Sequence, residues 1–221
     1  RHGEYQLVIN KKKVYRIFKK MGILRPQRKK SVLRPRKIAK NRSITASNQL
    51  FEMDIKYGYI SGEDRFFFVQ ECLDVFDRSV VAYHIGLHCT AEDVTRTLQE
   101  ALFKRQCWDN KEKPVVRTDN GPQYISHLFQ DACASWGMEH ERIPPKTPNM
   151  NAHIESFHRL LQEECFDYYG PFSTYAEAYE AVVLFMEGYN TRRIHSAIYD
   201  LAPHDYYDQC QNGLLQGMVV H

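Results

Sequence analysis

Three acidic residues stand at positions where a surface charge is not the ordinary choice. Asp54 lies inside the apolar run FEMDIKYGYI, Asp119 follows the short apolar run PVVRT, and Glu155 lies early in an expected helix. Carboxylates are hard oxygen ligands that suit Mg²⁺, and two such ions roughly 4 Å apart can drive an in-line phosphodiester displacement. Together the three acids predict metal-dependent phosphoryl-transfer chemistry.

Each acid also has an interpretation without catalysis. Alternation along the first apolar run places Phe51 and Met53 on one face and Asp54 on the other, and that second face can be exposed to solvent. Asp119 precedes a turn-forming Asn-Gly pair, and Glu155 would interact favourably with the dipole of its own helix. Asp119 is nevertheless well placed, because ligands collect beyond the carboxyl ends of strands in α/β sheets.

The elements that must position these acids follow from hydrophobic periodicity. Three consecutive segments rich in β-branched and aromatic residues are joined by short turns, which predicts an antiparallel meander followed by two shorter strands and four helices. Thr90 is the expected cap of the first helix, and Ser173 or Thr174 that of the last. The strands are expected within 50–60, 65–76, 79–87, 113–121 and 138–144, and the helices within 91–106, 126–137, 151–165 and 173–193. This order predicts an α/β domain with a mixed sheet.

The charge is distributed very unevenly along the chain. Residues 1–50 hold 16 of the 30 Lys and Arg residues but only one acid, Glu4, so their net charge is +15 and that of the remainder is −12. This basic arm predicts a polyanionic partner, nucleic acid first, with a solvated disordered tail as the alternative. Residues 10–25 have the spacing of a basic amphipathic helix. Its candidate DNA contacts are Lys12, Lys13, Arg16, Lys19 and Lys20.

Two other kinds of site are not expected. His153 and His158 flank Glu155, but they are five residues apart rather than the four that place two zinc ligands on one helix face. The six cysteines are widely spaced with no C-x-x-C pair, which predicts reduced thiols rather than a disulfide framework. No Gly-rich phosphate loop is present, so no nucleotide cofactor is expected.

The residues around the three acids resemble the Asp-Asp-Glu core of bacterial two-frame insertion-sequence transposases, which are related to retroviral integrases. The resemblance rests on Asp54, on TDNGPQY around Asp119 and on NAHIESF around Glu155, with 35 residues between the last two acids. It extends to NKKKVYRIFKKMGI and YNTRRIHSAIYDLAP on the two flanks.

The resemblance implies a ribonuclease-H-like α/β fold, with a mixed five-stranded sheet of three antiparallel strands followed by two parallel ones. Helices would flank the sheet, and a basic helical extension would precede it. The implied activity is that of a nuclease and strand transferase, which cuts at the ends of its element and joins the 3′ hydroxyl to another phosphodiester. Two alternatives remain: a catalytically silent DNA-binding or assembly protein, and a related nuclease acting on RNA–DNA hybrids or junctions.

Carried over to this chain, the resemblance makes Asp54, Asp119 and Glu155 the catalytic residues and the ligands of a two-metal Mg²⁺ site, with Mn²⁺ as a substitute. Family members often carry a Lys or Arg seven residues beyond the glutamate, where this chain has Gln162, so Arg159 or Lys146 is expected to supply positive charge instead. The DNA contacts under consideration in the core are Asn120, Gln123, Lys146, Arg159 and Gln162.

The implied partner is double-stranded DNA, both the inverted-repeat ends of an element and a target, bound by a dimer or a higher assembly. We expect a basic helical segment at 1–25, a basic linker at 26–49, the catalytic core at 50–205 and a C-terminal tail at 206–221. The first residue is Arg1, so the first segment is expected to be truncated. With no apolar run of ~20 residues and no secretory signal, a cytoplasmic, nucleoid-associated protein is expected.

Overall fold

The computed structural model describes residues 10–24, 37–144 and 148–220, and for Pro148 and Asn149 the backbone only. The chain divides into two compact units, Arg1–Pro35 and Arg36–His221. None of the helices within the described ranges is long and apolar enough to cross a lipid bilayer.

The first unit contains the expected basic helix, α1 (Lys11–Lys20). Asn10 caps it, because its side chain accepts a hydrogen bond from the Lys12 N–H at 2.9 Å. Lys19 and Lys20 lie in the last turn, where positive charge favours the helix dipole. No residue of α1 is buried, so its lysines and arginines face solvent.

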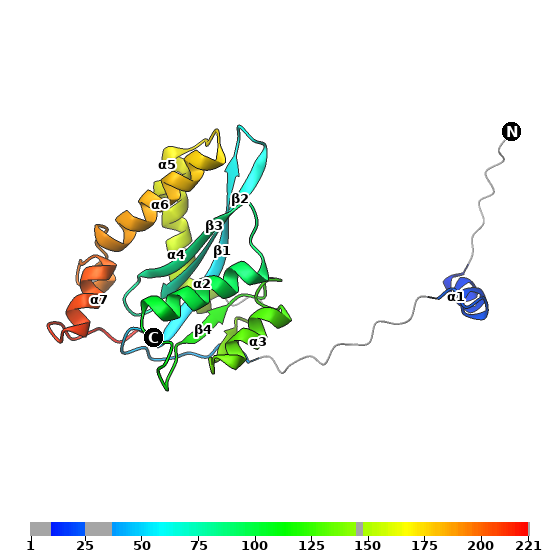
Figure 1. Cartoon of the computed structure of the whole chain (residues 1–221), viewed down its shortest axis with the longest axis horizontal. Helices are drawn as coiled ribbons and strands as arrows, with labels where there is room; N and C mark the ends of the chain where they lie inside the picture. The colour runs from blue at the N-terminus through cyan, green and yellow to red at the C-terminus, as the bar shows by residue number, and fades with distance from the viewer. Residues whose placement is uncertain (1–9, 25–36, 145–147, 221) are drawn as a thin grey trace. The chain divides into compact units, whose positions relative to one another are not determined.

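The second unit is built on a five-stranded mixed sheet in the order β3-β2-β1-β4-β5 (Figure 1). β1 pairs antiparallel with β2 and parallel with β4, β2 pairs antiparallel with β3, and β4 pairs parallel with β5. The strands are β1 (Leu50–Ile60), β2 (Arg65–Asp74), β3 (Val80–Gly86), β4 (Val115–Thr118) and β5 (His140–Arg142). Three antiparallel strands followed by two parallel ones is the predicted arrangement.

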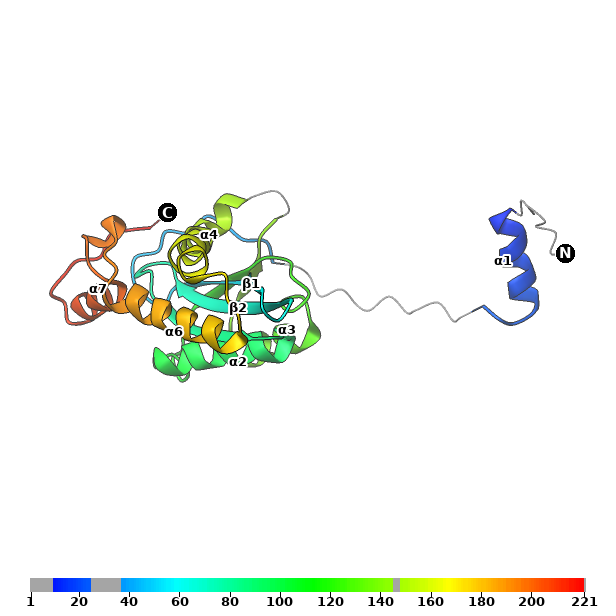
Figure 2. The same cartoon turned by 90° about the horizontal axis from the view of Figure 1, so that it is seen from above.

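Helices cover both faces of this sheet. Seen from above, α4 lies on one face, and α2 and α3 lie on the opposite face (Figure 2). The helix expected within 151–165 ends at Leu161 and continues as a π-helical turn, Gln162–Phe166. The main helices are α2 (Ala91–Lys104), α3 (His127–Ser135), α4 (Ala152–Leu161), α6 (Tyr175–Thr191) and α7 (Pro203–Gln211), and the shorter ones are Pro148–Asn151, α5 (Asp167–Tyr169) and Ser196–Ile198.

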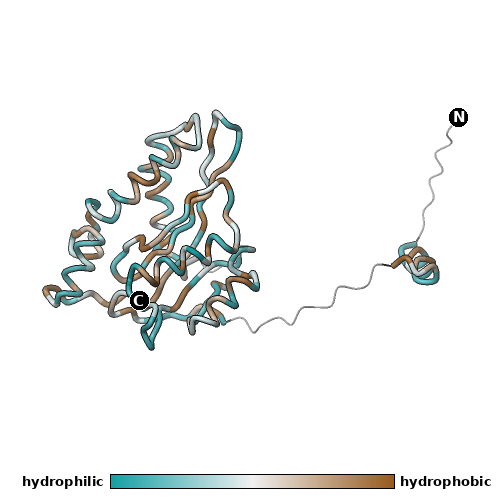
Figure 3. The backbone as a smooth tube through the Cα atoms, viewed as in Figure 1, coloured by the Kyte–Doolittle hydropathy of each residue, from teal (hydrophilic) through white to brown (hydrophobic). Residues whose placement is uncertain are grey.

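The strand alternation divides the apolar core into two layers, and the sheet strands carry long hydrophobic stretches (Figure 3). On one face of β1, Phe51 and Met53 pack with the buried side of α2. On the other face of the sheet, Val69 and Leu73 of β2 pack with α4 and α6. Burial of such side chains contributes roughly 25 cal/mol per Å² of apolar surface.

The predicted boundaries of α2 and α6 are confirmed at their N-termini. Thr90 and Asp93 form a reciprocal capping box at the start of α2. Of the two residues expected to cap the last long helix, Thr174 does so, accepting from the Glu177 N–H at 3.2 Å. One face of α2 is apolar and buried, with Val94, Leu98, Ala101 and Leu102 all inaccessible to solvent.

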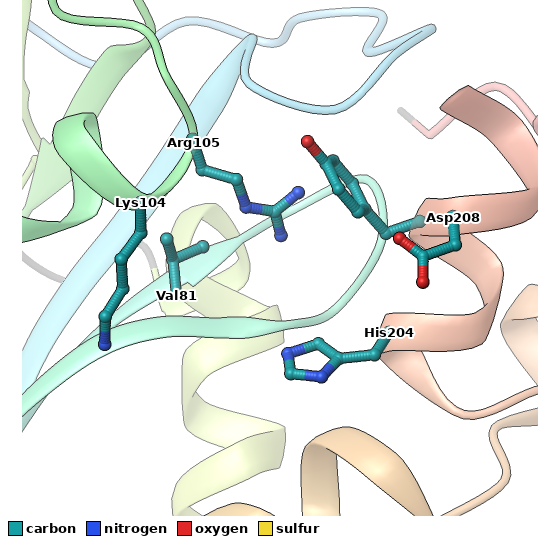
Figure 4. Close-up of a pocket in the computed structure, with 6 residues that line it drawn as sticks. Val81, Lys104, Arg105, His204 and Asp208 are labelled. Carbon is teal, nitrogen blue, oxygen red and sulfur yellow. The ribbon is translucent and has the colours of Figure 1, made fainter. Parts of the chain in front are cut away.

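A buried ion pair connects α2 to the turn after β2 and to α7. Arg105 lies 2.9 Å from Asp77, and its guanidinium stacks 3.8 Å above the ring centroid of Tyr207. Arg105 at the end of α2 and His204 on α7 border the same small pocket, of about 260 Å³ (Figure 4). Burial, with the neighbouring charge of Asp77 adding to it, raises the pKa of Asp74 to about 7.

Partly buried histidines make the stability of this fold dependent on pH. Burial, and then the charge of Arg142, lower the pKa of His140 to about 4, and its Nε2 lies 2.9 Å from the Thr118 hydroxyl oxygen. In the unfolded chain the same imidazole takes up a proton near pH 6.5. The contribution of His140 to the free energy of unfolding is therefore fully present above pH 6.5. It is lost as the pH drops toward 4, and the loss amounts to up to about 3 kcal/mol.

Denaturant unfolding at pH 7 and pH 4.5 tests this. We expect His140→Gln to lose clearly less stability between the two pH values than the parent protein, with His195, whose pKa burial also lowers to about 4, accounting for part of what remains. The exposed His88 is the control, since His88→Gln should keep the parent's pH dependence. An unchanged pH dependence in His140→Gln would refute the assignment.

Candidate active site

The pairing of β1 with β4 places Asp54 and Asp119 side by side. The last pair of the parallel ladder is Met53 with Thr118, so each acid is the next residue along its own strand. Neighbouring strands lie about 4.8 Å apart, which makes the two acids neighbours across the sheet. Because Asp54 alternates with the buried Met53, it lies on the face that α4 covers.

The Asp54 carboxyl group is held in place and surrounded by other acids. Its Oδ1 accepts a hydrogen bond from the Ile55 N–H at 2.8 Å. Burial is the main cause that raises the pKa of Asp54, and the negative charges of Asp119 and Glu155 add to it, while His158 opposes them. Both of the other predicted acids therefore act on the Asp54 carboxyl group.

Asp119 is fixed by the turn that follows β4. Its Oδ1 accepts the Gly121 N–H at 2.7 Å, and the Asn120 side-chain amide donates to the Ile143 carbonyl oxygen at 2.9 Å. A Cβ at position 121 would stand 2.9 Å from the same Asp119 oxygen, so glycine leaves the room that this bond needs. The turn motif therefore orients the carboxylate, and Asn120 uses its amide within the protein.

Glu155 lies in the first turn of α4 and is exposed. Within the described ranges, no three His, Cys, Asp or Glu side chains are gathered closely enough to hold a metal ion. Asp54, Asp119 and Glu155 nevertheless offer hard oxygen donors, one on β1, one directly after β4 and one on α4. Such a donor set fits Mg²⁺ or Mn²⁺ rather than a soft metal.

A buried strand carboxylate holds the beginning of α4. Asn151 occupies the N-cap position but makes no side-chain capping bond. Instead Glu52, which is 1% exposed, accepts the Ile154 N–H at 3.0 Å through Oε2. Its Oε1 lies 3.2 Å from Nδ1 of His153. Glu52 therefore satisfies an N-terminal amide of the helix and places a negative charge at the favourable end of the helix dipole.

A second buried carboxylate holds the middle of α4. Glu71 of β2 is fully buried and stands opposite Asp54 in the antiparallel ladder. His158 places Nε2 2.8 Å from the Glu71 Oε2 and Nδ1 3.8 Å from the Asp54 Oδ2. Burial opposes a proton on His158, yet Glu71 and then Asp54 outweigh it and raise the His158 pKa. Burial likewise raises the pKa of Glu71.

The roles of Glu52, Glu71 and His158 were missed from the sequence. Two features of the sequence could have indicated these roles. Glu52 lies on the same strand face as Asp54, and Glu71 interrupts the apolar run FFFVQECLDVF. Neither acid was among the predicted site residues. His158 had been considered only as a zinc ligand, whereas it bonds to a carboxylate.

The remaining predicted DNA contacts in the core differ in whether their side chains are engaged within the protein. The Gln162 side-chain amide donates to Asp167 at 2.7 Å, and the Gln123 amide donates to the Cys89 carbonyl oxygen at 2.9 Å. Arg159 is 65% exposed and lies 3.7 Å from Glu163, a long distance for an ion pair. Lys146 lies outside the described residues. The basic contacts proposed on α1, namely Lys12, Lys13, Arg16, Lys19 and Lys20, are all exposed.

Two family models, both of the integrase core domain, match residues 44–148 and 136–203 of this chain. Among curated proteins, the chain is similar to the putative transposase InsK for insertion sequence element IS150 of Escherichia coli (strain K12). The two are 27% identical over 175 residues, which cover 79% of this chain and 60% of that protein. The chain spans about half to three fifths of the length of the first curated relatives that it matches.

Solved structures share the fold. The simian T-cell lymphotropic virus intasome, in complex with the PP2A regulatory subunit B56 gamma, matches with a TM-score of 0.61 at 20% identity, over 78% of this chain and 58% of that chain. The HTLV-2 integrase catalytic core domain in complex with magnesium matches with a TM-score of 0.55 at 16% identity. This match covers 75% of this chain and 99% of that chain. The predicted ribonuclease-H-like fold of integrase catalytic cores is confirmed.

The capping role of Glu52 predicts a specific loss of stability. In Glu52→Ala the Ile154 N–H and His153 lose a buried acceptor, so the free energy of unfolding should fall by roughly 1–3 kcal/mol. Hydrogen exchange at the Ile154 amide should accelerate in the same variant. Glu92→Ala removes an exposed acid from the first turn of α2 and serves as the control. Equal losses in the two variants, with unchanged exchange at Ile154, would disprove the capping role.

Proposed function

Because the chain belongs to the insertion-sequence transposases that carry an integrase core domain, we propose that it is a metal-dependent catalytic core for DNA transposition. It cleaves a phosphodiester bond at each end of its element and joins the exposed 3′ hydroxyl to another DNA phosphodiester. The observation that carries this proposal is the β1–β4 register, which sets Asp54 beside Asp119 under the helix that bears Glu155.

The proposed cofactor is Mg²⁺ in a two-metal site, with Mn²⁺ as a substitute. Asp54, Asp119 and Glu155 would hold it, and the carboxylate donor set matches the preference of these ions. The magnesium complex of the HTLV-2 catalytic core supports the choice. When bound, the cations would activate the attacking oxygen and stabilise the leaving oxygen of an in-line displacement.

The residues of this chain would contribute orientation and charge. The backbone N–H groups of Ile55 and Gly121 each hold one oxygen of the neighbouring aspartate, which fixes the direction of both carboxylates. Burial raises the pKa of Asp54, the negative charges of Asp119 and Glu155 add to it, and a cation bound among these carboxylates would relieve their repulsion. Glu155 completes the donor set from a helix that Glu52 fastens to the same strand as Asp54.

The proposed partner is double-stranded DNA. The exposed lysines and arginines of α1 would contact phosphates, and Arg159 would do so beside the acids in place of the basic residue absent at Gln162. Coordinated joining of two element ends favours a dimer or a higher assembly, as the intasome among the structural relatives suggests. Such a substrate would place the protein with the nucleoid in the cytoplasm.

Substitution of one aspartate tests the reaction. The purified protein is mixed with DNA that carries the terminal inverted repeats flanking its gene, with Mg²⁺ or Mn²⁺. We expect Asp119→Asn to reduce both cleavage and strand transfer at least ~100-fold, because the metal contributes several kcal/mol to the transition state. DNA binding should stay close to that of the parent. Glu163→Gln, at an exposed acid just beyond α4, should retain activity.

Three outcomes would contradict the proposal. In the first outcome, the parent protein would neither nick nor join the cognate ends while a positive control works. Alternatively, Asp119→Asn leaves every measurable activity unchanged, as expected of a catalytically silent DNA-binding protein. Finally, RNA–DNA hybrids or junctions outcompete the element ends, as expected of a related nuclease.

A further inference from the structure

Three acids stand in a row across three neighbouring strands. Glu71 on β2 is opposite Asp54 on β1, and Asp119 follows the β4 residue that pairs with Met53. Like charges directly opposite each other in a sheet are destabilising. Asp54 therefore has one acid on each side, and the proposed metal site uses only one of these neighbours. The buried Glu71 has no part in that site and requires its own explanation.

His158 distinguishes the two neighbours of Asp54. It follows Glu155 by three residues, so the two side chains leave the same face of α4. Its ring is 12% exposed and lies between β1 and β2, with Nε2 2.8 Å from Glu71 and Nδ1 3.8 Å from Asp54. Within the described part of the chain, the second Glu71 oxygen, Oε1, makes no hydrogen bond. His158 is therefore the side chain that forms a hydrogen bond with the Glu71 carboxylate.

We propose that Glu71 and His158 are a positioning pair for the metal site. By holding the Glu71 carboxylate, His158 separates it from Asp54 and leaves the Asp54 carboxylate directed at Asp119. The same contact sets the height of α4 above the sheet, and with it the position of Glu155. This inference rests on the proposed function, and it assigns roles to two residues that the Asp-Asp-Glu motif does not include.

The other histidine–glutamate contact of α4 offers a matched control. Glu52 and His153 also join a buried strand acid to this helix, at 3.2 Å. Glu52 lies two residues before Asp54 and bonds to the start of α4, and in the described part of the chain neither Glu52 nor His153 forms a hydrogen bond or ion pair with Asp54. Removal of either histidine is therefore expected to lower the general stability. His153→Ala keeps the bond from the Ile154 N–H to Glu52 that holds the start of α4, so a change in the metal site is expected only when His158 is removed.

The experiment measures Mn²⁺ binding to the DNA-free protein by electron paramagnetic resonance, with unfolding curves for each variant. His158→Ala should raise the apparent Kd for Mn²⁺ roughly 10–100-fold, as is typical when a residue supporting a metal ligand is removed. The double variant Glu71→Gln/His158→Ala should return to within about threefold of the parent, because the charge facing Asp54 is gone. His153→Ala should leave the Kd near the parent value.

If His158→Ala does not fold, His158→Phe carries the same comparison, because phenylalanine fills the space of the ring but has no donor for Glu71. The inference is overturned if the Kd is unchanged in the single variant, or if the double variant binds Mn²⁺ no better than the single one. Asp54→Asn distinguishes a failure of the positioning pair from a failure of the proposed metal site. If Mn²⁺ binding is lost in Asp54→Asn but unaffected by His158→Ala, only the positioning pair fails. If Asp54→Asn also leaves binding unchanged, the proposed metal site fails with it.

Discussion

The attachment of α4 to the sheet through two buried carboxylates is the interaction on which the site depends. An ionised carboxylate inside a protein is costly unless it is paired and hydrogen-bonded. Glu52 and Glu71 both meet this requirement on α4, the first with the Ile154 N–H and His153, the second with His158. The need of these acids for partners therefore fixes the helix along its length. Since Glu155 lies between the two attachment points, its distance from the strand aspartates is set by the same contacts.

The alternation of β1 connects the hydrophobic core to the chemistry. Phe51 and Met53 enter the layer beneath α2, so Glu52 and Asp54 must point to the opposite face, toward α4. A slip of one residue in the pairing would turn the acids toward the apolar side chains of α2 and move Phe51 and Met53 to the face that α4 covers. The apolar core thus specifies the register that brings Asp54 beside Asp119. This relation explains how a site of like charges can be positioned by a sheet whose stability comes largely from apolar burial.

The sequence was informative where a local pattern decides the structure. The three antiparallel strands, the Thr90 cap and the buried face of α2 all follow from periodicity and capping, and the motif phrases identified the three acids proposed as ligands. Long-range pairing was not accessible in this way. The partner of Glu52 lies 102 residues away, and nothing near Glu71 in the sequence indicates that a histidine of a distant helix would pair with it. The amides of Asn120 and Gln123 bond to carbonyl groups of other segments for the same reason, so the sequence could not show that they are engaged within the protein.

The central claim is that Asp54, Asp119 and Glu155 act on one metal site while Glu71 is kept out of it. The most direct measurement is the anomalous difference map of crystals of this chain soaked with Mn²⁺. We predict Mn²⁺ bound by carboxylate oxygens of Asp54 and Asp119 on the α4 face, with Glu155 as a further ligand and Glu71 still bonded to His158. Mn²⁺ bound by Glu71, or bound at a place that involves neither aspartate, would contradict it.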